Sequence, residues 1–135
     1  MYGAIKTATK VILLSVLTLG IYISLFLYAT DDICKNIVYK EYASPNRLLK
    51  AVVFARDCGA TTGFSTQVSI LDFDESLDNS SGNILLIKGE PSYVALSFKW
   101  ISSSELFIDY SINGREFKAK KSYGYFNRVK IIYKN

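Results

Sequence analysis

Histidine is absent from this chain, and cysteine and proline occur only twice each among its 135 residues. The lack of histidine removes the commonest general base and the commonest metal ligand, so Ser-His-Asp and Cys-His mechanisms are excluded. Two cysteines cannot build a structural zinc site without other ligands. Two prolines are too few for a Pro-rich linker, and the chain contains neither an internal repeat nor a low-complexity run. These absences favour a protein that is not an enzyme and that holds neither a metal nor a cofactor.

One uncharged stretch stands out near the N-terminus, running from Val11 to Thr30 (VILLSVLTLGIYISLFLYAT). The hydrocarbon core of a bilayer is about 30 Å thick and needs about 20 apolar residues in a helix. Lys6 and Lys10 precede the stretch, whereas Asp31 and Asp32 follow it. Because positive charge stays on the cytoplasmic side, we expect the N-terminus inside and the chain from Asp31 onward outside.

A cleaved secretory signal is the main alternative for the same stretch. The apolar region of a signal is normally about 7–15 residues, which is shorter than this one. The best cleavage position follows Ala29, but Leu27 is a poor fit to the small residue wanted two positions earlier. A buried helix of a soluble protein is a third reading. We therefore predict an uncleaved single-pass anchor, with a cytoplasmic tail (1–10), a transmembrane helix (11–30) and an extracytoplasmic domain (31–135).

The net charge of +4 is unevenly distributed along the chain. From Asp31 to Gly114, seven basic residues face eleven acidic ones, a net charge of −4. From Arg115 to Asn135, seven basic residues face one acidic one, a net charge of +6. A basic end outside the membrane could contact anionic lipid or an envelope polymer, although solvated outward strand faces give the same pattern. Nucleic acid is not an expected partner of an exported domain.

The exported part is predicted to be all-β. In Phe64–Phe73, Phe64, Val68 and Ile70 alternate with polar residues, which predicts a strand with one buried face. The acidic segment Asp74–Gly82 reads as a solvated loop, because its spacing does not fit a calcium site. Strands at this spacing with polar turns indicate a small, mostly antiparallel sandwich or partly open barrel. The expected strands are Asn36–Tyr42, Leu48–Ala55, Phe64–Phe73, Asn83–Lys88, Tyr93–Trp100 (with Val94, Leu96, Phe98 and Trp100 inward), Glu105–Ile112, Arg115–Lys120 and Tyr125–Tyr133.

A two-residue hairpin is predicted at Asn113-Gly114, the strongest short hairpin signal, because both turn residues need positive φ. Aromatic residues would then face each other on one side, and an acid would face a base on the other. The expected register pairs Ile112 with Arg115, Tyr110 with Phe117, Ile108 with Ala119 and Asp109 with Lys118.

Both cysteines, Cys34 and Cys58, fall in the exported part of the chain. An oxidising compartment favours disulfides, so we expect the two to pair and to tie the first residues after the membrane to the domain. Closing a loop of this size contributes about 3 kcal/mol in the chain-entropy model. Two unrelated buried thiols are the alternative.

The segment from Arg56 to Gly63 (RDCGATTG) is the candidate binding loop. It joins two expected strands and combines small residues with two hydroxyls, one carboxylate and one guanidinium, and loops on a rigid sheet often display binding groups. Its amides could form an anion-binding concavity beside the guanidinium. In the alternative, structural reading, the threonines bond the loop's own backbone, Arg56 pairs with Asp57, and Cys58 is a staple. The candidate binding residues are Arg56, Asp57, Thr61 and Thr62.

A resemblance accompanies this segment. Ser44-Pro45-Asn46, an apolar strand and then Arg56-Asp57-Cys58-Gly59-Ala60-Thr61-Thr62 resemble a group of small uncharacterised bacterial membrane-anchored proteins with a β domain, a Ser-Pro-Asp/Asn turn and a Cys-Gly-Ala-Thr-Thr motif. The similarity covers Cys34 to Leu71, and this chain has Arg47-Leu48 where Gly-Lys often follows the turn. The resemblance implies placement in the bacterial inner (cytoplasmic) membrane and implies no activity.

These features together predict a non-enzymatic, membrane-anchored envelope protein whose exported β domain binds a protein partner. The partner would meet the candidate loop or add a strand to an exposed sheet edge. An inhibitor or immunity role against an exported toxin belongs to the same class. The alternative is an anionic envelope ligand, a lipid or a glycan, bound through Arg56 and the basic C-terminal strands.

Overall fold

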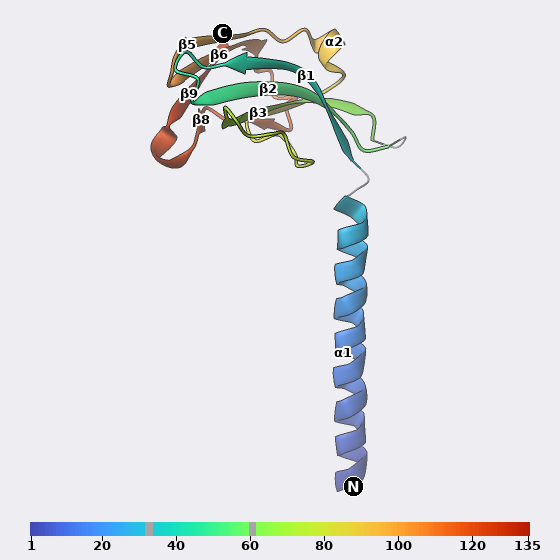
Figure 1. Cartoon of the computed structure of the whole chain (residues 1–135). Coiled ribbons are helices and arrows are strands. Elements are labelled where there is room, and N and C mark those ends of the chain that lie inside the picture. Colours follow the sequence, from blue (N-terminus) through green and yellow to red (C-terminus); the bar gives the residue numbers. More distant parts are fainter. Residues whose placement is uncertain (32–33, 60–61) are drawn as a thin grey trace. The chain divides into compact units, whose positions relative to one another are not determined.

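The computed structural model describes residues 1–31, 34–59 and 62–135. The chain forms two compact units, Met1–Ile33 and Cys34–Asn135. The first unit is a single helix, and the second is a β domain (Figure 1).

Helix α1 runs from Tyr2 to Asp31, so it contains the helix expected from Val11 and begins nine residues earlier. Its apolar window from Ile5 to Tyr28 spans 24 residues, and none of these residues is buried in the structure. At 1.5 Å per residue the window is about 36 Å long, enough to cross a bilayer. Its hydroxyls donate to carbonyls one turn back, as Ser15 does to Ile12 at 2.8 Å. The helix is therefore apolar on all sides and long enough to span a membrane.

The larger sheet has five strands in the spatial order β1-β2-β3-β4-β7, and every neighbouring pair is antiparallel. Its first three strands have nine residues each, and β1 lies at one edge. The strands are β1 (Lys35–Ala43), β2 (Leu49–Asp57), β3 (Phe64–Asp72), β4 (Leu85–Lys88) and β7 (Lys118–Ala119).

The smaller sheet has four strands in the order β5-β6-β9-β8. Its β6–β9 pair is parallel, and the other two pairs are antiparallel. These strands are β5 (Phe98–Ser102), β6 (Glu105–Ser111), β8 (Ser122–Tyr123) and β9 (Val129–Lys134).

One apolar core joins the two sheets, with alternate residues of each strand pointing into it. The architecture is a sandwich-like, mostly antiparallel all-β domain, and no barrel closes among the described strands. This agrees with the all-β prediction. The buried core residues are Leu49, Ala51, Val53, Val68, Ile70, Ile84, Leu85, Ile87, Phe98, Leu106, Ile108, Val129 and Ile131.

The outer face of the larger sheet carries a second, smaller core. Val52, Phe54 and Leu71 are buried there, and Leu77 packs against them from the segment between β3 and β4. That segment, residues 73–84, is here called the covering loop. Most residues from Asp74 to Ser81 are exposed, as expected of a solvated loop, but Leu77 packs against the sheet and Gly82 is buried, so the loop also covers part of the sheet face.

Strand β3 is consequently buried on both faces, so the prediction of a single buried face is wrong. Its side chains from Thr66 to Leu71 are all buried. The polar ones meet the covering loop: Gln67 Oε1 accepts the N–H of Gly82 at 2.6 Å, and Ser69 Oγ accepts the N–H of Asn83 at 3.2 Å. Polar residues at alternate positions mark a solvated face only when nothing covers them.

The hairpin predicted at Asn113-Gly114 does not form. Strand β6 has β5 along one edge and β9 along the other, so neither edge is free for a returning strand. The chain instead crosses to the larger sheet, where β7 pairs with β4. Asp109 pairs with Lys134 at 2.9 Å rather than with Lys118. The carboxylate of Glu116 organises the crossing by accepting the N–H groups of Asn113 (2.9 Å) and Gly114 (3.0 Å) and the hydroxyl of Tyr110 (2.8 Å).

Two expected strands begin at least four residues later than predicted. Helix α2 (Pro91–Val94) occupies the start of Tyr93–Trp100, with Pro91 in its first turn, and β5 begins at Phe98. The side chains expected to point inward there do pack against the core. The 3-10 turn η1 (Tyr125–Asn127) likewise delays the last strand, which begins at Val129.

The turn between β1 and β2 keeps its Ser-Pro-Asn geometry despite the absence of glycine. Arg47 donates its N–H to the carbonyl of Ser44 at 2.9 Å, and Ser44 Oγ accepts the N–H of Leu49 at 3.1 Å. Arg47 has φ 52, the left-handed conformation that glycine favours. Its guanidinium lies 5.9 Å from the ring centre of Phe73, a contact that offsets part of this strain.

The close approach of Gly82 to β3 leads to a stability prediction. A Cβ at this position would lie 3.0 Å from the Cβ of Gln67 and 3.0 Å from the carbonyl oxygen of Val68. Gly82→Ala should therefore destabilise the domain by about 1–3 kcal/mol through overpacking. Urea unfolding followed by the fluorescence of Trp100, the only tryptophan, measures this. Ser97→Ala, at an exposed site, is the control, and equal midpoints for the two variants would contradict a tightly held loop.

Tyr133 gives a prediction for alkaline pH. Burial, with a smaller effect of nearby Glu116, raises the pKa of Tyr133 from 10.0 to about 12, and its hydroxyl donates to the carbonyl of Lys120 at 2.9 Å. Because the folded pKa lies above the unfolded one, this group's contribution is complete below pH 10 and is lost as the pH rises toward 12.

Tyr133→Phe should therefore lose less stability than the native chain across that pH interval, as measured by the same unfolding assay. The comparison between the two chains removes the effect of the other tyrosines. Equal losses in the two chains would show that the Tyr133 hydroxyl is not linked to folding.

Candidate functional site

The candidate loop is shorter than the sequence indicates, because Arg56 and Asp57 are the last residues of β2. They pair with Asn36 and Lys35 of β1. Thr61, with Ala60, lies outside the described residues, so its part in the prediction is not addressed by the structure. The remaining predicted residue, Thr62, lies just before β3.

The predicted disulfide is confirmed. Cys34 and Cys58 are joined by an S–S bond of 2.03 Å and are 24 residues apart in the sequence. The bond links the residue before β1 to the residue after β2, so it closes the end of this strand pair.

Arg56 holds the covering loop. Its Nη1 donates to Asn36 Oδ1 at 2.8 Å, to the carbonyl of Asn79 at 2.8 Å and to the carbonyl of Ser80 at 3.2 Å. Asn36 Nδ2 adds bonds to the carbonyls of Asp78 at 2.9 Å and Ser80 at 2.7 Å. The two side chains act together as a clasp on the loop, and this is what Arg56 does within the domain.

Asp57 and Thr62 bond within their own segment. Asp57 Oδ1 accepts the N–H of Gly59 at 2.9 Å, and both the N–H and the hydroxyl of Thr62 donate to the carbonyl of Gly59 at 3.3 Å. Two of the amides proposed for an anion-binding concavity are thus already bonded. Arg56 and Asp57, as neighbours in a strand, point to opposite faces and form none of the ion pairs among the described residues. These contacts favour the structural reading of the loop, and its binding role stays a prediction.

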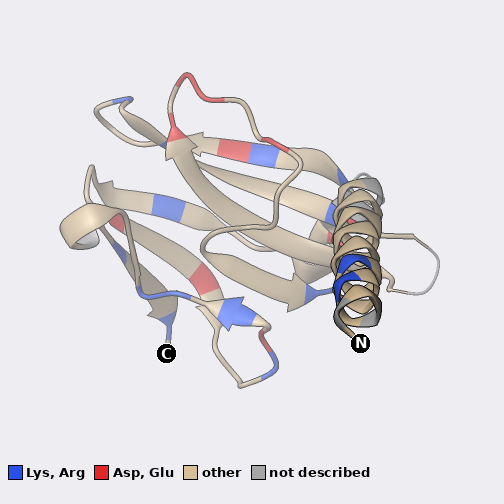
Figure 2. Cartoon of the chain, turned by 90° about the horizontal axis from the view of Figure 1, so that it is seen from below, with Lys and Arg blue, Asp and Glu red and all other residues tan. Residues whose placement is uncertain are grey.

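Three of the seven basic residues in the C-terminal part have a partner within the domain. Lys130 pairs with Glu105 at 3.6 Å, Lys134 pairs with Asp109, and Lys118 Nζ donates to the carbonyl of Gly82 at 2.8 Å. Figure 2 shows acidic and basic residues interspersed over the domain. The C-terminal part therefore combines paired lysines with basic residues that form no ion pair among the described residues.

The acidic residues of the covering loop do not assemble a cation site. Among the described residues, no group of three or more acidic, cysteine or histidine side chains is placed to hold a metal ion. Asp78 instead accepts hydrogen bonds from the hydroxyl and the N–H of Ser80, and these bonds lower the pKa of Asp78. The carboxylate therefore caps the loop's own backbone.

An exposed apolar surface on β1 is a feature that the sequence interpretation missed. Ile37, Val38 and Tyr39 are 59%, 47% and 58% exposed and follow one another in the chain. The register shifts between Val38 and Lys40, so the strand bulges there and neighbouring side chains on both faces meet solvent. Three consecutive apolar residues in an edge strand are the signal that could have revealed this surface.

Beside these residues lies a hollow of about 240 Å³. It forms where α2 and the residues before it face β2 and β3. Apolar side chains make up most of its wall, with Glu90 as its one charged residue. Its lining residues are Ile37, Val38, Tyr39, Ala55, Phe64, Glu90, Pro91 and Ser92, and together they are here called the β1 hollow.

Comparison of the chain with protein-family models, with curated proteins and with solved structures gives no match.

The contacts of the candidate loop generate a prediction that separates its two readings. Arg56→Ala leaves loop carbonyls without their charged donor, so it should destabilise the domain by about 1–3 kcal/mol. Thr62→Ala removes one long, exposed hydrogen bond and should change stability by less than about 0.5 kcal/mol. Unfolding followed by Trp100 fluorescence compares them. If Arg56→Ala left the stability unchanged, that result would contradict the role of Arg56 as a clasp. It would then favour a binding role for this guanidinium.

Proposed function

We propose that this chain is a non-enzymatic, membrane-anchored protein of the bacterial cell envelope whose extracytoplasmic β domain binds a protein partner. The observation that carries the proposal is the row of three exposed apolar side chains on β1 beside an apolar hollow. Exposed apolar residues in a continuous group are typical of interaction surfaces.

Three features support the anchored, exported arrangement. Helix α1 has an apolar window of 24 residues, with Lys6 and Lys10 in its first part and Asp31 at its end, which favours an N-terminus inside. The Cys34–Cys58 disulfide is typical of an oxidising compartment. The bacterial cytoplasmic membrane is proposed from the resemblance of the Ser-Pro-Asn turn and the Cys-Gly-Ala-Thr-Thr segment.

The geometry of β1 favours an extended segment of the partner as the ligand. An edge strand offers unpaired backbone groups, and strand addition uses them for affinity while side-chain pockets provide specificity. At the C-terminal end of β1, the Nε1 of Trp100 donates to the carbonyl of Tyr42 at 2.9 Å. That hydrogen bond already uses a backbone group of the edge strand. The free part is thus the half that borders the hollow, where a large apolar side chain of the partner would be buried.

The alternative ligand, an anionic lipid or glycan held by Arg56 and the C-terminal strands, has less support. Arg56 Nη1 is occupied by Asn36 and by two carbonyls of the covering loop. Lys118, Lys130 and Lys134 each have a partner within the domain. An apolar binding surface also predicts weak dependence on salt, whereas a polyanion would dissociate steeply as ionic strength rises.

The test is photo-crosslinking in intact cells that express the full chain with a photoreactive phenylalanine analogue at Tyr39. Ile37→Glu is the test variant, because it places a charge in the hollow. Ile101→Glu is the matched control, since Ile101 is 53% exposed on β5, an edge strand of the other sheet. A third variant combines Arg56→Ala, Thr61→Ala and Thr62→Ala.

We expect one crosslinked protein in the native chain and in Ile101→Glu, and at least a tenfold loss in Ile37→Glu. Trp100 fluorescence melting confirms that each variant is folded. A crosslink that survives Ile37→Glu but disappears in the folded triple variant would move the site to the candidate loop. Equal crosslinking by all the chains would refute both sites.

A further inference from the structure

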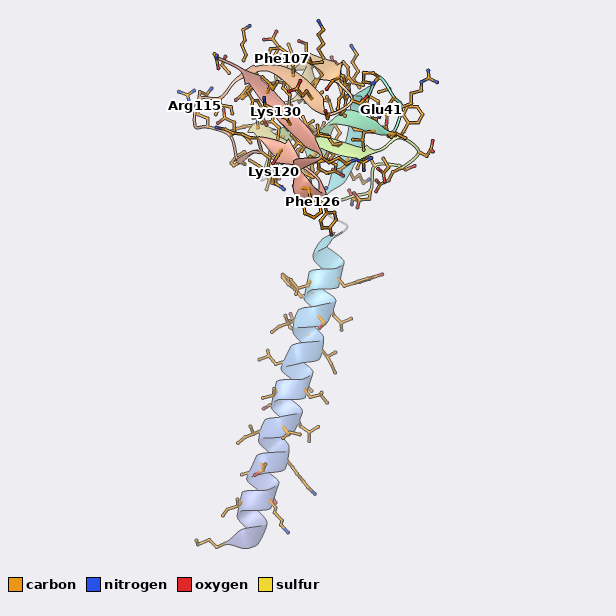
Figure 3. The ribbon with its side chains drawn as sticks, turned by 90° about the vertical axis from the view of Figure 1, so that its left-hand side faces the viewer. Glu41, Phe107, Arg115, Lys120, Phe126 and Lys130 are labelled. Atoms are coloured by element: carbon orange, nitrogen blue, oxygen red, sulfur yellow. A yellow bond between two sulfur atoms is a disulfide. The ribbon has the colours of Figure 1, made fainter. Side chains whose placement is uncertain are left out.

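A second exposed apolar feature lies on the turn between β8 and β9. Tyr125 is 95% exposed and Phe126 is 102% exposed, so neither ring is covered by the domain. Figure 3 shows Phe126 at the end of the domain, projecting from the ribbon. Two adjacent aromatic rings without an intramolecular contact expose more apolar surface than a connecting turn requires.

The backbone of this turn holds the rings outward. Phe126 has φ 55, a left-handed conformation that costs a bulky residue free energy. Gly124, at φ 83, allows the approach of Arg128, because a Cβ there would lie 3.0 Å from the Cβ of Arg128. On either side, Tyr123 packs against the core and Val129 is fully buried. This turn, residues 124–128, is here called the aromatic tip. It is short and held at both ends by buried or core-packed residues, and the strain at Phe126 is not offset by a contact of its ring with the domain.

Three basic side chains accompany the rings. Lys120, Lys121 and Arg128 are exposed, and none of them has an ion pair among the described residues, unlike Lys130 and Lys134. Carboxylates are also near, since Asp72 and Glu75 act electrostatically on Tyr123. The local excess of positive charge is therefore small, and the aromatic rings are the dominant feature.

Only a short segment of chain connects α1 to the domain. Helix α1 ends at Asp31 and β1 begins at Lys35, so the connection reaches at most about 14 Å. Within the domain, η1 and the start of β1 both lie in the lower part of Figure 1, at its left and right ends, whereas α2 lies in the upper part. The aromatic tip and the start of β1, where the chain from α1 enters, thus lie on the same face of the domain.

We propose that Tyr125 and Phe126 insert into the headgroup region of the bilayer that holds α1, with Lys120, Lys121 and Arg128 beside lipid phosphates. Aromatic rings favour the membrane interface, and basic residues favour anionic lipid. The tether makes this contact intramolecular, so a weak intrinsic affinity suffices. The contact fixes the orientation of the domain on the membrane. The proposal rests on the membrane anchoring proposed above and is independent of the β1 hollow.

The test uses the full chain, isotopically labelled, in nanodiscs of phosphatidylcholine with or without phosphatidylglycerol. A lipid with a paramagnetic headgroup broadens the NMR signals of amides close to the surface. We expect the amides of Tyr125 and Phe126 to broaden several-fold more than that of Tyr93 on α2. Broadening at Lys35 serves as the internal check that the anchor is inserted.

Matched variants identify the responsible side chains. Tyr125→Ser with Phe126→Ser should abolish the excess broadening on the tip, whereas Tyr93→Ser, which removes an aromatic ring that is 85% exposed, should leave it unchanged. Lys120→Glu with Lys121→Glu should reduce it mainly in discs that contain phosphatidylglycerol. Lys99→Glu on β5 is the control for charge. The unchanged amide spectrum of the rest of the domain shows that each variant is folded.

Each other outcome overturns the proposal at an identifiable step. Broadening at Lys35 without excess broadening at Tyr125 means that the domain is anchored but its tip does not meet the lipid. No broadening at either position refutes the anchoring and, with it, the insertion. Tip signals that shift with protein concentration rather than with the paramagnetic lipid would assign the tip to a protein contact.

Discussion

The buried side-chain amide of Gln67 holds the covering loop against the middle of the domain. Its Oε1 accepts the N–H of Gly82 and, at 3.2 Å, the hydroxyl of Ser81, and its Nε2 donates to Ser65 Oγ at 2.9 Å. The side-chain oxygen and nitrogen of Gln67 are therefore both hydrogen-bonded, so burying this amide costs little free energy. With the Arg56–Asn36 clasp, it keeps Val52, Phe54 and Leu71 out of water on a sheet face that no second sheet covers.

Arg56, Asp57 and Thr62 of the candidate loop bond to groups of the domain itself, which favours the structural reading of that loop. The candidate loop contains an arginine, an aspartate, two glycines and two threonines. These residue types are expected of a ligand site, but they also stabilise irregular backbone through local hydrogen bonds. In this domain the described ones do the second task. Exposed apolar side chains of the domain lie elsewhere, among them those on β1 and on the turn before β9.

Local patterns predicted the parts of the fold that local chemistry decides. The apolar helix, the β1–β2–β3 succession, the Ser-Pro-Asn turn and the cysteine pair all follow from neighbouring residues or from the compartment. The Asn113-Gly114 hairpin did not form because β6 pairs with β5 on one edge and with β9 on the other. These two strand pairings outweigh the preference of a two-residue turn for a hairpin. The buried polar face of β3 was unpredictable for the same reason, since only the covering loop decides whether Gln67 meets water. The exposed β1 residues were visible in the sequence, but their meaning depends on the bulge and on the strand's place at the edge.

The disulfide also determines how the domain responds to mechanical load. In the proposed anchored arrangement, a force transmitted through α1 reaches the domain at Cys34, the residue before β1. Without a crosslink, that force would unzip β1 from β2 one hydrogen bond at a time, which is the weakest direction in which to pull a strand pair. The bond to Cys58 makes the same ends of β1 and β2 move together. Tension transmitted through α1 is then shared with the interior strand β2, and the edge strand stays in register while it is under load.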